Sequence, residues 1–380
     1  MKILHTADWH IGRKLNGFDL LEEQRHAFKQ VVDIAQQEQV DAIVIAGDLY
    51  DRSVPATEAV EAFNQMMIAL NLDKKIPVLA ISGNHDSSTR LETGGPWFEH
   101  TQFHLHTSLE QAFEPIEMQD TQFFLLPYFE PFQARRYFHD ESIKSLEEAM
   151  EKIVRKMKKK FDSNKNQVLV AHFFAAGSQK SESETLLTVG GLEAVPVTLM
   201  EDFDYVALGH LHNKNALRHE KIKYSGTLLK YSLSEWKQEK GVRIVEINAH
   251  KVTQAFQKIT PLKEVMCIEE TFQTLMSPDF YKNICCENYI GISLKDQQII
   301  PNVMAQLRSI YPNIIHLERA QGREVTKQKQ RDIKELKSLD PAALFRHYFK
   351  DTTGETLTEL QEKVMIEALL ESQKKIGSEG

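Results

Sequence analysis

The chain has 380 residues, and its 46 Lys and Arg against 54 Asp and Glu give a formal charge of −8 at pH 7. Hydrophobic residues make up 42% and charged residues 26%, which is typical of a globular protein of two or three domains and excludes a disordered chain. Three cysteines are too few for a disulfide framework, and no run of 18 apolar residues occurs, so the sequence predicts a cytoplasmic protein without membrane association. The acidic total makes strong DNA binding by this chain alone unexpected, but it does not exclude DNA, and it makes a DNA-binding partner part of the prediction.

Short apolar runs alternate with longer amphipathic stretches over the first 250 residues. We expect buried strands at residues 3–7, 42–46, 78–81, 168–171 and 205–208, and helices at 20–39, 57–70 and 142–161. This alternation predicts a layered α/β domain over residues 1–258, with helices covering a sheet.

The composition changes after about residue 258. Strands at 267–272, 289–294 and 314–318 and a helix at 301–311 predict a small α+β domain over residues 259–325. Residues 251–331 hold 11 basic and 8 acidic side chains, and they are the only basic part of the chain.

Residues 326–376 are predicted to form a linker and two helices, and 377–380 a disordered tail. Asp340-Pro341 predicts the start of the first helix, and a Thr356-x-x-Glu359 capping box predicts the start of the second. Little chain remains to cover the apolar faces of these helices. They are therefore expected to dock another protein, with packing on this chain's own domain as the alternative.

Each predicted strand of the first domain runs into a polar cluster. Because the carboxyl ends of strands in a layered α/β domain meet at one edge, residues far apart in sequence should gather there. The five clusters are Asp8-Trp9-His10, Gly47-Asp48-Leu49-Tyr50-Asp51, Gly83-Asn84-His85-Asp86, His172, and Gly209-His210-Leu211-His212.

The clusters supply carboxylates, imidazoles and one amide but no thiolate, a donor set that suits Mn²⁺, Fe²⁺ or Zn²⁺. About seven ligands are too many for one open catalytic ion and fit two ions. Asp48 is the natural bridging carboxylate, since Gly47 lets the backbone turn tightly before it. Paired ions can clamp a phosphate, and His85 is then the candidate to donate a proton to the leaving oxygen or to hold the phosphate. His104-Leu105-His106 has the same H-x-H spacing without a carboxylate, and we interpret it as structural.

The order D-x-H, G-D-x-x-D, G-N-H-D, His and G-H-x-H resembles the signature of the calcineurin-like metallophosphoesterases. With its flanking residues, the sequence is similar to the SbcD family of bacterial nuclease subunits, which work with the ATPase SbcC. The resemblance implies an α/β fold: a layered metallophosphoesterase β-sandwich flanked by helices, with a small α+β capping domain and a C-terminal helical pair.

The resemblance also implies a site by position. One Mn²⁺ would be held by Asp8, His10, Asp48 and His212, and a second by Asp48, Asn84, His172 and His210, with His85 as the catalytic histidine. Asp51 is either an outer residue that orients a ligand or merely part of the turn.

The activity that the resemblance implies is Mn²⁺-dependent and ATP-dependent. It comprises 3′→5′ double-strand exonuclease, single-strand endonuclease and hairpin opening, in DNA recombination, replication and repair. A homodimer within a heterotetramer with SbcC would fit the family. No G-x-x-x-x-G-K-[ST] loop occurs in the sequence, so ATP dependence would come from the partner.

Four basic residues follow the ligand clusters and are candidate DNA contacts, with solvated loop charges as the alternative: Arg13, Lys14, Arg52 and Arg90. A phosphatase or cyclic-nucleotide phosphodiesterase would have the same two-metal core, but a minimal one does not need the 130-residue C-terminal extension. A mainly scaffolding subunit is disfavoured because every ligand position is filled.

Overall fold

The computed structural model describes residues 1–179, 194–320, 341–353 and 356–376. It divides into two compact units, the first comprising Met1–Cys267 with Glu287–Gly291 and the second Ile268–Cys286 with Ile292–Gly380. Within the described ranges, no helix combines the length and the apolar character that crossing a membrane requires.

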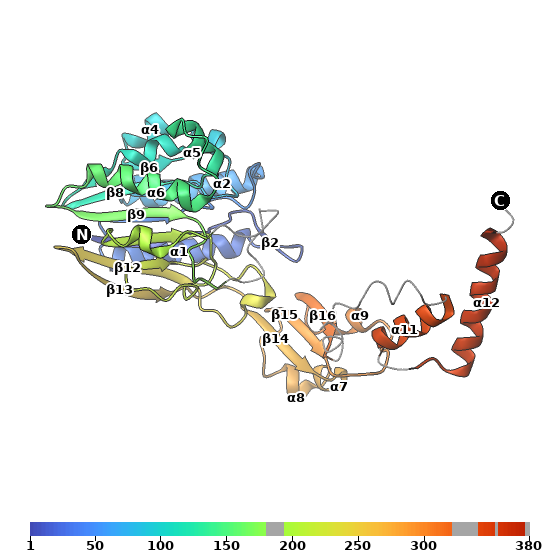
Figure 1. Ribbon diagram of the computed structural model, residues 1–380. Coiled ribbons are helices and arrows are strands. Elements are labelled where there is room, and N and C mark those ends of the chain that lie inside the picture. Colours follow the sequence, from blue (N-terminus) through green and yellow to red (C-terminus); the bar gives the residue numbers. More distant parts are fainter. Residues whose placement is uncertain (180–193, 321–340, 354–355, 377–380) are drawn as a thin grey trace. The chain divides into compact units, whose positions relative to one another are not determined.

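The first unit contains a six-stranded sheet that includes the N-terminal strand (Figure 1). β1, β4, β5 and β6 are mutually parallel, and β12 pairs antiparallel with β1, so the N-terminal strand lies in the middle of the sheet. In sheet order, the strands are β13 (Lys251–Lys258), β12 (Gly241–Asn248), β1 (Lys2–Thr6), β4 (Ala42–Ala46), β5 (Val78–Ile81) and β6 (Phe103–His106).

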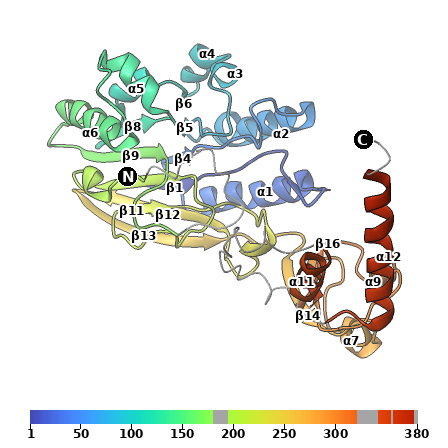
Figure 2. The same cartoon turned by 45° about the vertical axis from the view of Figure 1, so that its right-hand side comes forward.

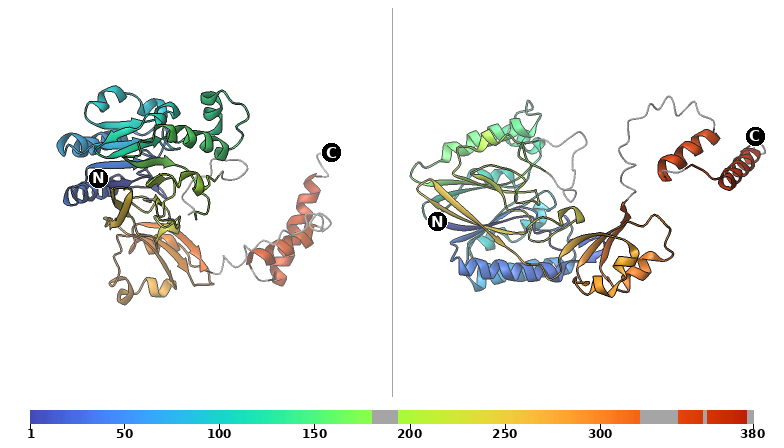
Figure 3. Two further views of the ribbon diagram at one scale, coloured as in Figure 1. Left: turned by 60° about the vertical axis from the view of Figure 1, so that its left-hand side comes forward. Right: turned by 90° about the horizontal axis from the view of Figure 1, so that it is seen from below.

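A five-stranded sheet packs face to face against the first (Figure 3). Its order is β11 (Ile222–Tyr224), β10 (Tyr205–Gly209), β9 (Asn166–His172), β8 (Thr121–Leu126) and β7 (Ile116–Met118), and only β7 is antiparallel to its neighbour. Val44 and Leu79 of one sheet share a fully buried core with Val168 and Tyr205 of the other. This shared core makes the two sheets a sandwich.

Helices cover the outer faces of the sandwich (Figure 2). α1 (Leu21–Gln37) and α2 (Thr57–Met67), which continues as the π-helical η1 (Ile68–Asp73), lie along the first sheet. α5 (Pro131–Phe138) and α6 (Leu146–Met157) bury apolar side chains against the second sheet. The shorter elements are β2 (Lys14–Leu15), β3 (Phe18–Asp19), α3 (Ser88–Leu91), α4 (Gly95–Glu99), η2 (Leu109–Phe113), η3 (Lys158–Lys160), η4 (Val197–Met200) and η5 (Leu233–Glu235).

The predicted α/β class and the layered sandwich are confirmed, and all five predicted strands of this unit exist as β1, β4, β5, β9 and β10. The helix predicted at 142–161 has the wrong bounds. It begins at Leu146 because the Ser145 hydroxyl accepts a hydrogen bond from the Glu148 amide, and residues 158–160 form the separate turn η3.

The C-terminal part contains a three-stranded sheet of β14 (Val265–Glu270), β15 (Tyr289–Leu294) and β16 (Ile314–Arg319), as predicted. The predicted helix at 301–311 is the shorter α9 (Val303–Arg308). The remaining helices are α7 (Phe272–Leu275), α8 (Pro278–Tyr281), α11 (Pro341–Thr353) and α12 (Glu359–Ile376). The predicted linker at 326–340 and the tail at 377–380 lie outside the described residues.

The predicted capping box of α12 is wrong by two residues. Thr358 and Gln361 make the reciprocal pair: the Thr358 amide donates to Gln361 Oε1 at 2.9 Å, and the Gln361 amide donates to Thr358 Oγ1 at 3.4 Å. Since α12 begins at Glu359, this residue cannot be the third helical position that a box starting at Thr356 would require.

Candidate metal centre

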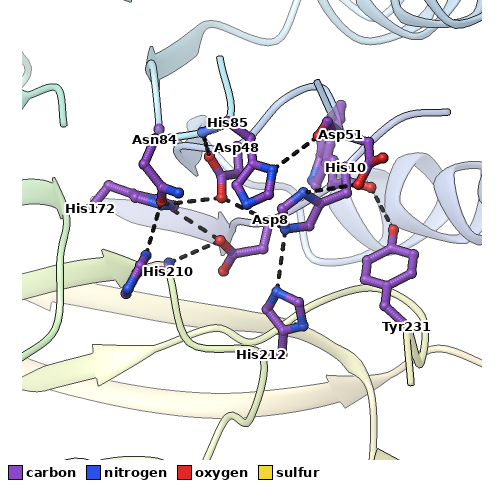
Figure 4. Close-up of polar contacts among 12 residues, drawn as sticks. Asp8, His10, Asp48, Asp51, Asn84, His85, His172, His210, His212 and Tyr231 are labelled. Atoms are coloured by element: carbon purple, nitrogen blue, oxygen red, sulfur yellow. Dashed lines mark hydrogen bonds and ion pairs between the residues drawn. The ribbon is translucent and has the colours of Figure 1, made fainter. Parts of the chain in front are cut away.

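The strand ends bring all seven predicted metal ligands together at one edge of the sandwich (Figure 4). The first sheet contributes the residues that follow β1, β4 and β5, and the second contributes the last residue of β9 and the residues after β10. The ligands therefore come from both sheets: Asp8, His10, Asp48 and Asn84 from the first, and His172, His210 and His212 from the second.

Four of these residues have a backbone conformation that side chains rarely adopt. The φ angles are 52° at Asp8, 44° at His10, 51° at Asp48 and 93° at His210. Such residues cluster at functional sites, where the surrounding structure holds them in place. The tight turn predicted for Gly47 is confirmed by its φ of 88°, and a Cβ there would lie 2.3 Å from His172 Nδ1.

The first group of ligands converges on one point. His10 Nε2 lies 3.2 Å from His212 Nε2 and 3.6 Å from Asp48 Oδ2. Asp8, His10 and Asp48 offer ligand atoms close enough to hold one ion, and the buried Oδ2 of Asp8 has no hydrogen-bond partner among the described residues. Because facing imidazole nitrogens and an unpartnered carboxylate oxygen need a cation or proton between them, these residues fit a divalent ion.

The second group lies beside the first and shares one atom with it. Asn84 Oδ1 lies 2.9 Å from His172 Nε2 and 3.0 Å from His210 Nδ1. His172 Nε2 is in turn 3.3 Å from Asp48 Oδ2, the same oxygen that faces His10 in the first group. This is the position that a bridging carboxylate requires.

Burial sets the protonation of these groups. It holds the pKa of His10 well below its ordinary value and lowers that of His210 to about 3, so both imidazoles keep a lone pair for a cation. Burial also raises the pKa of Asp8 to about 6. For Asp48, burial opposes ionisation, but the neighbouring His172 outweighs it and holds the carboxyl pKa below its usual range.

His85 is oriented differently from the predicted ligands. Its backbone amide donates to Asp48 Oδ1 at 2.9 Å, and its Nδ1 donates to the main-chain oxygen of Asp51 at 2.9 Å. The ring centroids of His85 and His10 are 4.7 Å apart. His10, Asp51 and His85 also form a group able to hold a cation, so the imidazole of His85 borders the first group.

Asp51 forms ion pairs with two of the basic residues that are predicted to contact DNA. Arg13 Nη1 lies 3.0 Å from Asp51 Oδ1, and Arg52 Nε lies 3.6 Å from Asp51 Oδ2. Lys14 on β2 and Arg90 on α3 are exposed. The structure thus places Arg13 and Arg52 beside the centre, and DNA contact by all four basic residues stays a prediction.

Asp86, the last residue of the Gly83-Asn84-His85-Asp86 cluster, has a structural role. Its carboxylate accepts hydrogen bonds from the amides of Leu49, Tyr50 and Gly83 at 2.9–3.0 Å. It therefore ties the loop after β4 to the loop after β5. In the sequence, only its position directly after Gly83-Asn84-His85 indicates that Asp86 belongs near the site.

Three further residues support the centre from positions that no sequence signal marked. The buried Gln24 amide donates to the main-chain oxygens of Trp9 (3.1 Å) and His10 (2.8 Å), and the Tyr231 hydroxyl also donates to Trp9 O. The third residue is Glu235, whose Oε1 lies 3.1 Å from His212 Nδ1. Gln24 is in α1, and the other two lie in the segment between β11 and β12.

Comparison with known proteins matches two families to this chain. The calcineurin-like phosphoesterase family matches residues 1–214, and the family described as type 5 capsule protein repressor C-terminal domain matches residues 261–353. A protein of Staphylococcus epidermidis named as the SbcD subunit of the nuclease SbcCD is 37% identical over 95% of this chain and 96% of its own length. One of the same name from Staphylococcus saprophyticus is 37% identical over 98% of this chain and 100% of its own. A solved structure, TT1561 of Thermus thermophilus, is 12% identical with a TM-score of 0.38, covering 67% of this chain and 98% of that one.

The chain therefore belongs to the calcineurin-like phosphoesterases. Membership of this class implies the binding of divalent metal ions, which the carboxylate, imidazole and amide donors of the centre fit. Within the class, the chain belongs to the family of SbcD subunits of the nuclease SbcCD.

Proposed function

We propose that this chain is a DNA nuclease subunit that hydrolyses phosphodiester bonds with two divalent ions. The observation that carries the proposal is the position of Asp48 Oδ2, which faces His10 Nε2 at 3.6 Å on one side and His172 Nε2 at 3.3 Å on the other. A carboxylate shared in this way is what two ions about 3.5–4 Å apart need.

In this proposal, one ion is held by Asp8, His10, Asp48 and His212, and the other by Asp48, Asn84, His172 and His210. Mn²⁺ is the proposed metal because mixed oxygen and nitrogen donors suit it. When bound, the ions would supply positive charge to the phosphate oxygens and help to activate water.

The protein's own acid is proposed to be His85. Its Nδ1 donates to Asp51 O, which fixes the ring and directs Nε2 away from that carbonyl. A protonated Nε2 can then give its proton to the leaving oxygen of the DNA backbone. Asp51 has a positioning role here, through its main-chain oxygen toward His85 and its carboxylate toward Arg13.

The proposed assembly is a homodimer of this chain in a complex with the ATPase SbcC, acting on DNA ends and hairpins in the cytoplasm. The names of the two Staphylococcus relatives, which place them in SbcCD, support the complex. Three exposed apolar side chains on α2 and η1 support the homodimer, namely Val60 (36% exposed), Ile68 (46%) and Leu72 (51%). The proposed activities are 3′→5′ double-strand exonuclease and single-strand endonuclease.

The test is cleavage of linear and hairpin duplex DNA by the purified chain with Mn²⁺, with and without the ATPase and ATP. We expect cleavage by the complex, and loss of it when a chelator removes the ions. Rapid turnover of phosphomonoesters without any DNA cleavage by the complex would contradict the proposal and favour the phosphatase alternative.

A substitution of His85 separates the proposed acid from the metal ligands. His85→Ala should reduce cleavage by about 10²–10⁴-fold, the usual contribution of a general acid, while calorimetry still shows two bound Mn²⁺. Loss of an ion in this variant would make His85 a ligand instead.

The matched control is His250→Ala. His250 is half exposed and pairs with Asp204, next to the N-terminal end of β10, whereas His210 and His212 follow the opposite end of this strand. Cleavage and metal binding should both be unchanged in this variant.

A further inference from the structure

Glu235 is a buried carboxylate that none of the strand-end motifs contains. It lies at the end of η5 and is 0% exposed. Its Oε1 faces His212 Nδ1 at 3.1 Å, and its Oε2 forms an ion pair with the ammonium of Lys240, which is 5% exposed. Because a buried, unpaired charge is strongly destabilising, each of these two charges needs the other.

The contact between Glu235 and His212 fixes the imidazole tautomer. An ionised carboxylate only accepts hydrogen bonds, so the proton of a neutral His212 resides on Nδ1 and the lone pair on Nε2. This Nε2 is the atom that lies 3.2 Å from His10 Nε2, where the first ligand group converges. Carboxylates that orient a metal-binding imidazole through its other nitrogen typically raise its affinity for the ion.

The same segment also holds the main chain of His212. The Lys240 ammonium donates to His212 O at 2.9 Å, and the amide of Thr227 donates to the same oxygen at 3.3 Å. His212 is therefore held at both ends: Glu235 contacts its ring, and Lys240 contacts its carbonyl. Tyr231, in the same segment, packs its ring 5.6 Å from that of His10 (Figure 4).

We propose that Glu235, paired with Lys240, is a positioning residue for the metal centre. It holds the His212 ring in the tautomer and orientation that direct Nε2 at the ion shared with His10. The inference rests on the proposed function, because it takes His212 to be a metal ligand.

The test removes the carboxylate without leaving a buried charge. E235L/K240M replaces the ion pair by apolar side chains of similar length, so His212 Nδ1 loses its acceptor. We expect calorimetry with Mn²⁺ to show one ion bound about 10–100-fold more weakly and the other unchanged, the usual effect of losing such a partner. Unchanged binding of both ions would overturn the proposal.

A conservative variant separates positioning from folding. E235Q/K240M keeps an amide oxygen that can accept from His212 Nδ1, and we expect it to bind both ions with affinities within about threefold of the native protein. Loss of one ion in this variant would mean that the charge pair, not the hydrogen bond to the ring, controls binding, and would overturn the proposal. Thermal unfolding, monitored by circular dichroism, shows whether each variant is folded.

The control applies the same two substitutions to an ion pair at the other end of the strands. Lys165 and Glu117 form a partly exposed pair, and Lys165 directly precedes β9. E117L/K165M should bind both ions normally, and loss of an ion here would show that the effect is not specific to Glu235. His212→Ala tests the underlying assumption, since normal binding of both ions in that variant would remove His212 from the ligand set and refute the proposed site itself.

Discussion

Two of the left-handed residues of the centre, Asp8 and His10, are held by a neighbouring loop. The amide of Asp8 donates to Gly47 O and that of His10 donates to Asp48 O, both at 3.0 Å. A non-glycine residue in such a conformation costs about 1–3 kcal/mol, so it persists only where its surroundings fix it. Here the loop after β1 and the loop after β4 fix each other, and their carboxylates are presented together.

At Gly209, the absence of a side chain allows two strands to approach across the centre. A Cβ there would lie 1.9 Å from Ala46 O and 2.8 Å from His172 Nδ1, the two atoms that form the hydrogen bond holding the His172 ring. Gly209→Ala should therefore lower the free energy of unfolding by about 1–3 kcal/mol and weaken Mn²⁺ binding.

Urea unfolding and calorimetry measure both effects. Gly95→Ala is the control, because a Cβ at Gly95 meets nothing within 4 Å. If Gly209→Ala is as stable as the native protein, the close approach at Gly209 does not constrain the centre.

His106, which is not among the proposed ligands, provides a pH-dependent contribution to stability. It is 9% exposed, its Nδ1 lies 3.2 Å from Leu125 O in the other sheet, and burial lowers its pKa to about 4. The unfolded chain takes up a proton at this imidazole near pH 6.5, and the folded protein does not until about pH 4. The contribution of His106 is therefore fully present above about pH 6.5 and decreases as the pH falls toward about 4.

The expected loss at pH 5 is about 2 kcal/mol relative to pH 8. His106→Gln should remove this part of the pH dependence, as measured by urea unfolding at pH 8, 6.5 and 5. His100→Gln, at an exposed histidine, is the control. An equal loss of stability on acidification in the native and H106Q proteins would contradict this role for His106.

At the scale of elements, the predictable part of the fold is the part that is buried on both faces. β4 and β5 are continuous apolar runs, and their predicted bounds agree with the structure. β13 was not predicted, because it is an edge strand whose sequence, KVTQAFQK, has neither a continuous apolar run nor a regular alternation of polar and apolar residues.

The same reasoning explains which parts of the site were found. The seven proposed ligands follow predictable strands, so the strand-end rule predicts them together, and the structure brings them to one edge of the sandwich. Glu235 lies in a short turn between β11 and β12, where no periodicity marks a residue, and its contact with His212 spans 23 residues. Only the folded structure reveals this contact.

The capping box of α6 is a feature of local sequence with a measurable effect. Ser145 Oγ accepts from the Glu148 amide at 3.1 Å, and Glu148 Oε2 accepts from the Ser145 amide at 3.3 Å. Ser145→Ala should lower the free energy of unfolding by about 1 kcal/mol in urea titrations. Ser142→Ala is the control, since the Ser142 hydroxyl precedes the helix and makes a solvent-exposed hydrogen bond to Asp140. If the two variants have equal free energies of unfolding, the capping box does not contribute to the stability of the protein.

At the scale of the whole molecule, the proposed chemistry and the proposed docking surface lie in different units. Every predicted ligand belongs to the first unit, which has its own core between the sheets. α11 and α12 of the second unit carry exposed apolar side chains, namely Leu344, Phe345, Tyr348, Leu360, Val364 and Ile366. Apolar side chains exposed together in this way mark a surface for another protein.

Deleting residues 332–380 should therefore abolish binding of the ATPase partner and leave metal binding intact. Co-purification measures the first effect and calorimetry with Mn²⁺ the second. Tyr348→Asp, at a side chain that is 67% exposed, should weaken partner binding in the full chain. Leu262→Asp, at a residue of the first unit that is 54% exposed, should not. Co-purification of the truncated chain with the ATPase would refute the docking role.

The pairing of β12 with β1 has a consequence for the order of events during synthesis. The N-terminal strand is the third strand of its sheet and remains without one neighbour until residues 241–248 have left the ribosome. The first proposed ligand, at residue 8, likewise waits for the last, at residue 212. The donor set is thus incomplete until residue 212 has been made and the pairing of β1 with β12 until residue 248 has, and long-range pairing of this kind is slow. Metal binding is therefore expected to follow folding. The ions would stabilise the domain once it has folded and would not initiate its folding.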